Sequence, residues 1–109
     1  MFKLVIKKTF PLNYEFPNYG NAVFNAMLGT FQDLEQQNIG SRPVFANTET
    51  LAVSTREMYH NDKTLLENYV NALLNGKIND SEVPILKQKI DRENHFGVST
   101  ECTITEVTP

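Results

Sequence analysis

The chain has 109 residues, of which 40% are hydrophobic and 21% are charged, and its formal net charge is −3. This length and balance predict one globular domain over residues 1–109 and do not fit a disordered, fibrous or membrane-spanning chain. The negative charge argues against a general nucleic-acid binder, which normally carries a basic surface.

The two ends of the chain are predicted to be β-strands. Apolar and polar positions alternate in Phe2-Lys-Leu-Val-Ile-Lys7, and Val98, Cys102 and Ile104 alternate with more polar neighbours near the other end. A period of two is typical of a strand with one buried face. If the two strands pair, the lysines of the first lie beside the glutamates of the last, which is a favourable arrangement.

A loop and a long helix are expected next. Two prolines and several asparagines between Thr9 and Gly20 prevent a regular element there. Helical spacing then predicts a helix over residues 21–38, with Gly40 placed to end it. Its apolar stripe consists of Phe24, Met27, Leu28, Phe31 and Leu34.

Residues 42–55 fit two structures. Pro43-Val-Phe-Ala46 and Leu51-Ala-Val-Ser54 can form two short strands around a polar turn. Alternatively, Thr48 can cap a short helix that runs to Met58. The hairpin is the preferred interpretation.

Two more helices are predicted before the last strand. Asp62 is a good N-cap for the first of them, and Gly76 is placed to end it. Its apolar stripe consists of Leu65, Leu66, Tyr69, Val70 and Leu73. The second helix is expected to be capped by Ser81, to hold Pro84 in its first turn and to end near Asn94.

The predicted order is strand, helix, strand, strand, helix, extra helix, strand. With the extra helix treated as an insertion, this order resembles the ferredoxin-like superfold, an α+β arrangement of split βαβ units. The resemblance implies an antiparallel sheet with the terminal strands paired and the helices on one face. A superfold of this kind carries no function by itself.

Catalytic and ligand-binding signals are weak. His60, within Glu57-Met-Tyr-His-Asn-Asp62, and His95, near Asp91, have carboxylates close by, as a general base requires. Both are expected in polar turns, where histidine usually contacts only water. The single cysteine, Cys102, excludes an intramolecular disulfide and is expected to be buried. No metal-ligand spacing, nucleophile elbow or phosphate loop is present, so no metal or cofactor is expected.

The loop after the first strand is the best functional candidate. Phe10, Tyr14, Phe16 and Tyr19 lie close together in it, beside the acidic Glu15. Aromatic side chains in a proline-stiffened loop lose little entropy on binding, and they are enriched at interface hot spots. The other interpretation is that these rings fold back as a lid over the core.

We therefore expect a small, acidic, non-enzymatic inhibitor or adaptor, of the kind that phages and mobile elements carry. Its partner would be a macromolecule, most simply another protein, bound through the aromatic loop. The alternative is a dimeric ferredoxin-like enzyme or ligand-binding domain. Its apolar pocket would be lined by Met27, Phe31 and Tyr69, near His60 or His95.

The sequence also bears on the cellular location and the oligomeric state of the protein. The N-terminus alternates in the manner of a strand and lacks the apolar run of a signal segment, so a cytoplasmic location is the default expectation. No membrane partner is expected, because no run approaches the roughly 18 apolar residues that span a bilayer. A homodimer is compatible with these patterns.

Overall fold

A computed structural model describes residues 1–38 and 40–107 of the chain. Within them, the protein is a mixed α+β fold with a four-stranded antiparallel sheet, a two-stranded hairpin and four helices. In chain order the elements are β1 (Phe2–Pro11), α1 (Ala22–Thr30), α2 (Gln32–Gln37), β2 (Val44–Asn47), β3 (Leu51–His60), α3 (Lys63–Asn75), β4 (Lys77–Ile78), β5 (Ser81–Glu82), α4 (Pro84–His95) and β6 (Ser99–Glu106). No helix among the described residues is long and apolar enough to cross a membrane.

The main sheet has the strand order β2-β3-β1-β6, and all neighbours are antiparallel. The terminal strands therefore pair as the sequence predicts, from Phe2 opposite Glu106 to Thr9 opposite Ser99. Lys7 lies directly opposite Glu101, which places opposite charges on neighbouring strands. This pairing makes the strand nearest the N-terminus a central strand of the sheet.

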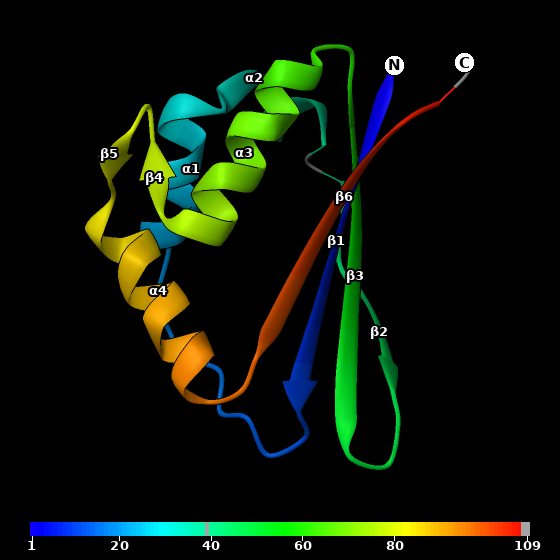
Figure 1. The fold of residues 1–109 in the computed structure, drawn as a ribbon, viewed down its shortest axis with the longest axis vertical. Coiled ribbons are helices and arrows are strands. Elements are labelled where there is room, and N and C mark those ends of the chain that lie inside the picture. The colour runs from blue at the N-terminus through cyan, green and yellow to red at the C-terminus, as the bar shows by residue number, and fades with distance from the viewer. Residues whose placement is uncertain (39, 108–109) are drawn as a thin grey trace.

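The helices lie on one side of the sheet, and the other side is open (Figure 1). The core forms between these layers, where alternate residues of β1 and β3 face the helices. Its largest fully buried side chains are Leu4, Leu34, Met58 and Leu66. Because successive strand residues point to opposite faces, residues such as Lys3, Val5 and Glu57 lie on the open face.

Both strands β1 and β3 are longer than the sequence predicted. β1 continues to Pro11, so Phe10 is a buried strand residue, 5% exposed, rather than part of the loop. The hairpin interpretation of residues 42–55 is confirmed, but β3 runs on to His60. The expectation that His60 lies in a polar turn is therefore wrong, since it is a buried strand end. Polar Ser54 and Arg56 occupy positions of β3 that face the helices. The apolar and polar residues therefore do not alternate regularly along this strand in the sequence.

The helix predicted over residues 21–38 is two helices that meet at Phe31. Gly29 and Thr30 precede this break, and both residue types have low helix propensity. Breaking the helix lets Phe31 and Leu34 both enter the core, with 2% and 0% exposure. Phe24, predicted to face inward, is 48% exposed instead.

Helix α3 begins and ends as predicted. The Asp62 side chain accepts hydrogen bonds from the backbone N–H groups of Thr64 and Leu65, which caps the first turn. Gly76 follows the last turn with φ +67°, a left-handed conformation that favours glycine. A side chain there would also crowd the backbone of Lys87, 3.2 Å from the position of a Cβ atom.

The start of the third predicted helix was wrong. Ser81 does not cap it but lies in β5, which pairs with β4 in a short hairpin. Asn79 and Asp80 form the turn with φ values of +51° and +65°, a conformation that Asn and Asp tolerate in tight hairpins. Helix α4 begins two residues later than such a cap would give, with Val83 as its N-cap and with Pro84 in its first turn as expected.

Candidate interaction surface

Three segments meet at the end of the sheet where β1 finishes. β1 ends at Pro11, the loop over residues 12–20 turns back toward the helices, and α4 ends nearby at His95 (Figure 1). Phe10 projects from β1 on the helix side, while Phe96 follows the last residue of α4. The fold therefore brings the predicted loop to the C-terminal end of a helix that lies far away in the sequence.

Four aromatic rings pack together where these segments meet, and we call Phe10, Tyr14, Phe16 and Phe96 the aromatic surface. The ring centroids of Phe10 and Phe16 are 5.0 Å apart, and that of Tyr14 lies 5.1 Å from Phe16 in an edge-to-face arrangement. Phe96 contacts Tyr14 at 6.1 Å, also edge to face. Such geometries stabilise aromatic pairs, so each ring fixes the position of its neighbours.

The rings of the aromatic surface differ in exposure. Phe10 is buried and Tyr14 is half-buried, so these two pack against the body of the protein. Phe16 is 64% exposed and Phe96 is 47% exposed. Leu12, at 48% exposed, extends the apolar area. The loop thus covers part of the core and also presents large apolar side chains to solvent.

A small hollow of about 250 Å³ lies beside these rings. It is lined by Pro11, Asn13, Tyr14, Glu15, Arg92 and Phe96. The Arg92 guanidinium lies 4.8 Å from the centroid of Phe96, within the range of a cation–π contact. One of its N–H groups also donates to the backbone oxygen of Glu15 at 3.1 Å. Arg92 therefore attaches the loop to α4 and forms one wall of the hollow.

A buried ion pair supports the aromatic surface from behind. Lys8 Nζ lies 2.5 Å from Glu93 Oε2, which joins β1 to α4, and 5.9 Å from the centroid of Phe10. The second oxygen of Glu93 lies 3.4 Å from Lys89. Burial of the Lys8 ammonium, followed by the positive charge of Lys89, lowers the pKa of Lys8 from 10.5 to about 8, although Glu93 opposes this shift.

We expect Lys8→Met to remove a pH-dependent part of the stability. Between pH 8 and 10.5 the unfolded chain still holds the Lys8 proton that the folded protein has released, so rising pH favours the folded state. The variant lacks this group. The free energy of unfolding of the wild type, relative to that of Lys8→Met, should therefore increase as pH rises from 8 to 10. Urea unfolding of both proteins at several pH values measures this difference, and a difference independent of pH would contradict it.

Tyr19, the last aromatic residue of the predicted loop site, is separate from the aromatic surface. Its ring forms no aromatic pair within the described residues, and its hydroxyl group is buried without a hydrogen-bond partner among them. Glu15 does lie at the hollow, but it contacts Arg92 through its backbone oxygen.

The residues of the alternative pocket lie mostly in the core. Met27, Phe31 and Tyr69 are 2–3% exposed, and the Phe31 and Tyr69 rings pack edge to face at 5.2 Å. The structure does not bring the two histidines together, because β3 ends in His60 at one end of the molecule and α4 ends in His95 at the other (Figure 1). His95 is exposed beside Phe96, at 4.9 Å between ring centroids.

His60 has hydrogen-bond partners on both ring nitrogens. Its Nδ1 accepts from the backbone N–H of Asp62 at 2.9 Å, so the proton lies on Nε2, 2.5 Å from the Asp33 carboxylate. This hydrogen bond lowers the pKa of Asp33 below its ordinary value. Neither nitrogen is left free to accept a proton from a substrate. Among the described residues, no group of three or more His, Cys, Asp or Glu side chains could hold a metal ion.

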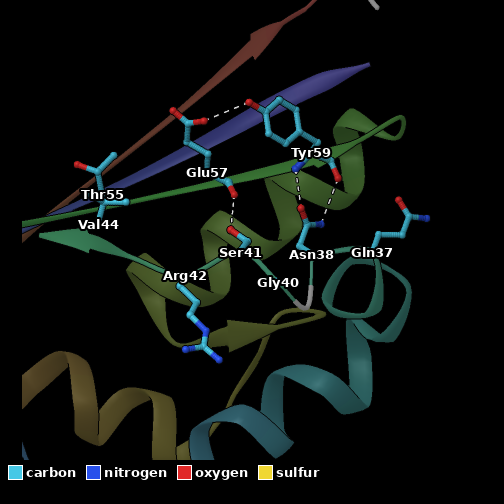
Figure 2. A pocket seen from close by; sticks show the side chains of 9 residues that line it. All are labelled: Gln37, Asn38, Gly40, Ser41, Arg42, Val44, Thr55, Glu57 and Tyr59. Atoms are coloured by element: carbon cyan, nitrogen blue, oxygen red, sulfur yellow. Dashed lines mark hydrogen bonds between the residues drawn. The ribbon is translucent and has the colours of Figure 1, made fainter.

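A second hollow, of about 650 Å³, lies at the margin of the sheet beside β2 and β3 (Figure 2). Here the Oδ1 atom of Asn38 accepts a hydrogen bond from the Tyr59 N–H, and its Nδ2 donates to the Tyr59 carbonyl. The Asn38 side chain therefore makes the hydrogen bonds that a neighbouring strand would make. The Ser41 hydroxyl likewise donates to the Glu57 carbonyl. These side chains close the edge of β3 where β2 does not reach (Figure 2).

No protein-family model, curated protein or solved structure matches this chain. The aromatic surface therefore stands on its geometry alone. Sequence reasoning selected its loop residues but missed Phe96 and Arg92. The segment Arg92-Glu-Asn-His-Phe96 shows a cationic and an aromatic residue in the sequence. Only the fold shows that this segment meets the loop.

Proposed function

We propose that this protein is a small interaction module that binds another protein through the aromatic surface. One observation carries the proposal: Phe16 and Phe96, from distant segments, flank Tyr14 and are exposed while Tyr14 and Phe10 pack beneath them. Clustered large apolar side chains on the surface of a soluble domain mark interaction sites more often than single ones do. This fits the role of inhibitor or adaptor that the sequence suggests.

The aromatic surface has the properties that favour tight contacts. Aromatic residues and arginine are enriched at the centres of interfaces and among hot spots. The rings of Tyr14 and Phe16 already contact Phe10, and Arg92 already lies against Phe96. Because these side chains are ordered before binding, a partner would restrict them little further.

The local charges favour a protein with an apolar anchor beside a basic group. Lys8 is paired with Glu93, and Arg92 is engaged by the loop backbone, so these two cations are not free to bind a nucleic-acid backbone. Glu15 is exposed at the rim of the hollow. An apolar side chain of the partner would enter the hollow, and a neighbouring lysine or arginine would lie near Glu15.

We also propose that the fold is ferredoxin-like, with β4, β5 and α4 inserted before the last strand. The strand order β2-β3-β1-β6 and the antiparallel pairing of all neighbours support this assignment. The assignment adds nothing to the functional argument, because this superfold hosts many unrelated activities.

The binding proposal is tested by crosslinking followed by affinity measurement. A photoactivatable residue at position 16 should crosslink one protein in a lysate of the source cells, and that protein should bind the purified wild type. The double variant Phe16→Ala/Phe96→Ala should raise the dissociation constant at least about tenfold, since each truncated hot-spot residue costs about 1 kcal/mol or more. Calorimetry measures the change.

A matched control separates binding from folding. Leu74→Ala removes a side chain of similar exposure, 40%, from α3 and should leave the dissociation constant unchanged. The melting temperature of the double variant should stay close to that of the wild type, because neither ring belongs to the buried core. Undiminished affinity in a folded double variant would refute the proposed surface.

A further inference from the structure

Strand β2 is an open edge of the sheet. It is the terminal strand in the order β2-β3-β1-β6, and all four of its residues are exposed. Val44 is 71% exposed and Phe45 is 55% exposed, although both are large and apolar. Within residues 1–38 and 40–107, no helix or strand lies beyond β2 (Figure 1). Natural proteins usually protect such an edge with charges, bulges or a covering segment, because unpaired strand edges associate readily.

The register shows which backbone groups of β2 point outward. Asn38 binds both the N–H and the C=O of Tyr59, so Tyr59 points toward this margin, and Thr55 and Val53 point the same way because orientation alternates along a strand. Their partners in β2 are Val44 and Ala46. The intervening Phe45, and Asn47 after it, therefore direct their N–H and C=O groups away from the sheet.

Only the β2 part of this margin is open to another strand. The flanking part of β3 is closed by the side chains of Asn38 and Ser41, which bind the backbone of Tyr59 and Glu57 (Figure 2). Pro43 precedes β2 at an outward-facing position, where its missing N–H removes no bond to β3. The free edge is therefore short and runs from the Pro43 carbonyl to the Asn47 N–H.

We propose that this edge pairs with β2 of a second copy of the chain, antiparallel and centred on Phe45. In that register Phe45 faces Phe45 of the second copy, and the two residues exchange both of their backbone hydrogen bonds. The Asn47 N–H then faces the Pro43 carbonyl of the second copy, and the reverse pair forms by symmetry. Every outward N–H from Pro43 to Asn47 finds an acceptor in this register.

The side chains suit the same register. The two Phe45 rings lie next to each other on the helix side of the joined sheets, and Val44 lies opposite Ala46 of the second copy on the open side. Arg42 lies opposite Thr48 of the second copy, and Glu49 follows Thr48 in the turn of that copy's hairpin. Both Arg42 and Glu49 are exposed, and neither forms a salt bridge within the described residues. The twofold axis creates two such complementary charge contacts, which favours a second copy over an unrelated strand.

Analytical ultracentrifugation of the full chain tests the proposal. The interface is small, so we expect a weak dimer whose average mass rises from one copy toward two across the micromolar to millimolar range. Phe45→Lys should raise the dissociation constant at least about tenfold, because two lysines then lie directly opposite each other. Leu74→Lys, on α3, adds the same charge at a site that is 40% exposed and should leave association unchanged. The mass of a single copy at every concentration would overturn the proposal.

A charge exchange tests the register itself. Arg42→Glu and Glu49→Arg should each weaken self-association by about three- to tenfold, because each variant places like charges across the axis. An equimolar mixture of the two variants should recover association near the wild-type level, because both contacts are then complementary. Failure of the mixture to recover would exclude the register centred on Phe45.

Amide hydrogen exchange provides a readout that does not depend on substitutions. Protection of the Phe45 and Asn47 amides should increase with protein concentration, because only the dimer satisfies them. The Val44 and Ala46 amides should be protected at every concentration, since they bind β3 within one copy. Concentration-independent exchange at Phe45 in a sample that dimerises would assign the dimer to another surface and overturn the inference.

Discussion

Replacing Leu4 with alanine is expected to destabilise the protein by about 3–5 kcal/mol, the range for truncating a fully buried leucine. Leu4 is 0% exposed, and it lies between Met58 of β3 and Ile104 of β6 in the centre of the sheet. Domains of this size have total stabilities of about 5–15 kcal/mol, so the variant should retain only part of the wild-type value. Equilibrium unfolding in guanidinium chloride measures the loss.

Val5→Ala is the matched control for this prediction. Val5 is the next residue of the same strand, but it points to the open face and is half-buried. Its truncation should cost about 1 kcal/mol or less, since little apolar contact is lost. Equal losses for Leu4→Ala and Val5→Ala would mean that the helix side of the sheet is not the only core-forming face.

Replacing Arg56 with methionine is expected to cost about 3 kcal/mol, because the substitution leaves the Glu35 carboxylate without its cation. Glu35 is only 5% exposed, with Oε2 3.7 Å from Arg56 Nη2 and Oε1 accepting from the Tyr69 hydroxyl at 2.6 Å. Burial, together with the hydrogen bond and the charge of Glu35, raises the pKa of Tyr69, so this hydroxyl stays a donor. Urea unfolding measures the loss.

A double variant tests the cause of that loss. Glu35→Gln/Arg56→Met removes both charges but keeps an oxygen that accepts from Tyr69, so most of the lost stability should return. The cycle of two single variants and the double variant then gives the coupling energy between residues 35 and 56. A double variant no more stable than Arg56→Met alone would show that the arginine acts through packing and not through its charge.

The sequence predicted those elements whose signals are local. Alternation in β1 and β6 predicted both strands and their pairing, and Asp62 and Gly76 predicted the limits of α3. The extension of β3 to His60 was missed because Arg56 and His60 face inward and are polar. Their partners, Glu35 and Asp33, lie on α2, so the reason for burying them is not visible in the strand itself.

The candidate site was predictable only in part, for the same physical reason. Aromatic and proline content identified the loop around Tyr14 and Phe16, because those signals lie within one short segment. Phe96 and Arg92 join them through tertiary contacts, whereas Tyr19 forms no aromatic pair among the described residues. The break at Phe31 likewise depends on packing, which overrides the regular helical spacing of residues 21–38.

The central position of β1 also bears on how the chain folds during synthesis. Residues 2–11 leave the ribosome well before one neighbour of this strand, residues 99–106, has been made. At about 5–20 residues per second, translation leaves that edge of the strand uncovered for a few seconds after residue 60 has been made. Pairings this distant in sequence also close slowly. Nascent chains of this protein should therefore need that edge of β1 to be covered early. Chains released before residue 106 should aggregate through the uncovered edge.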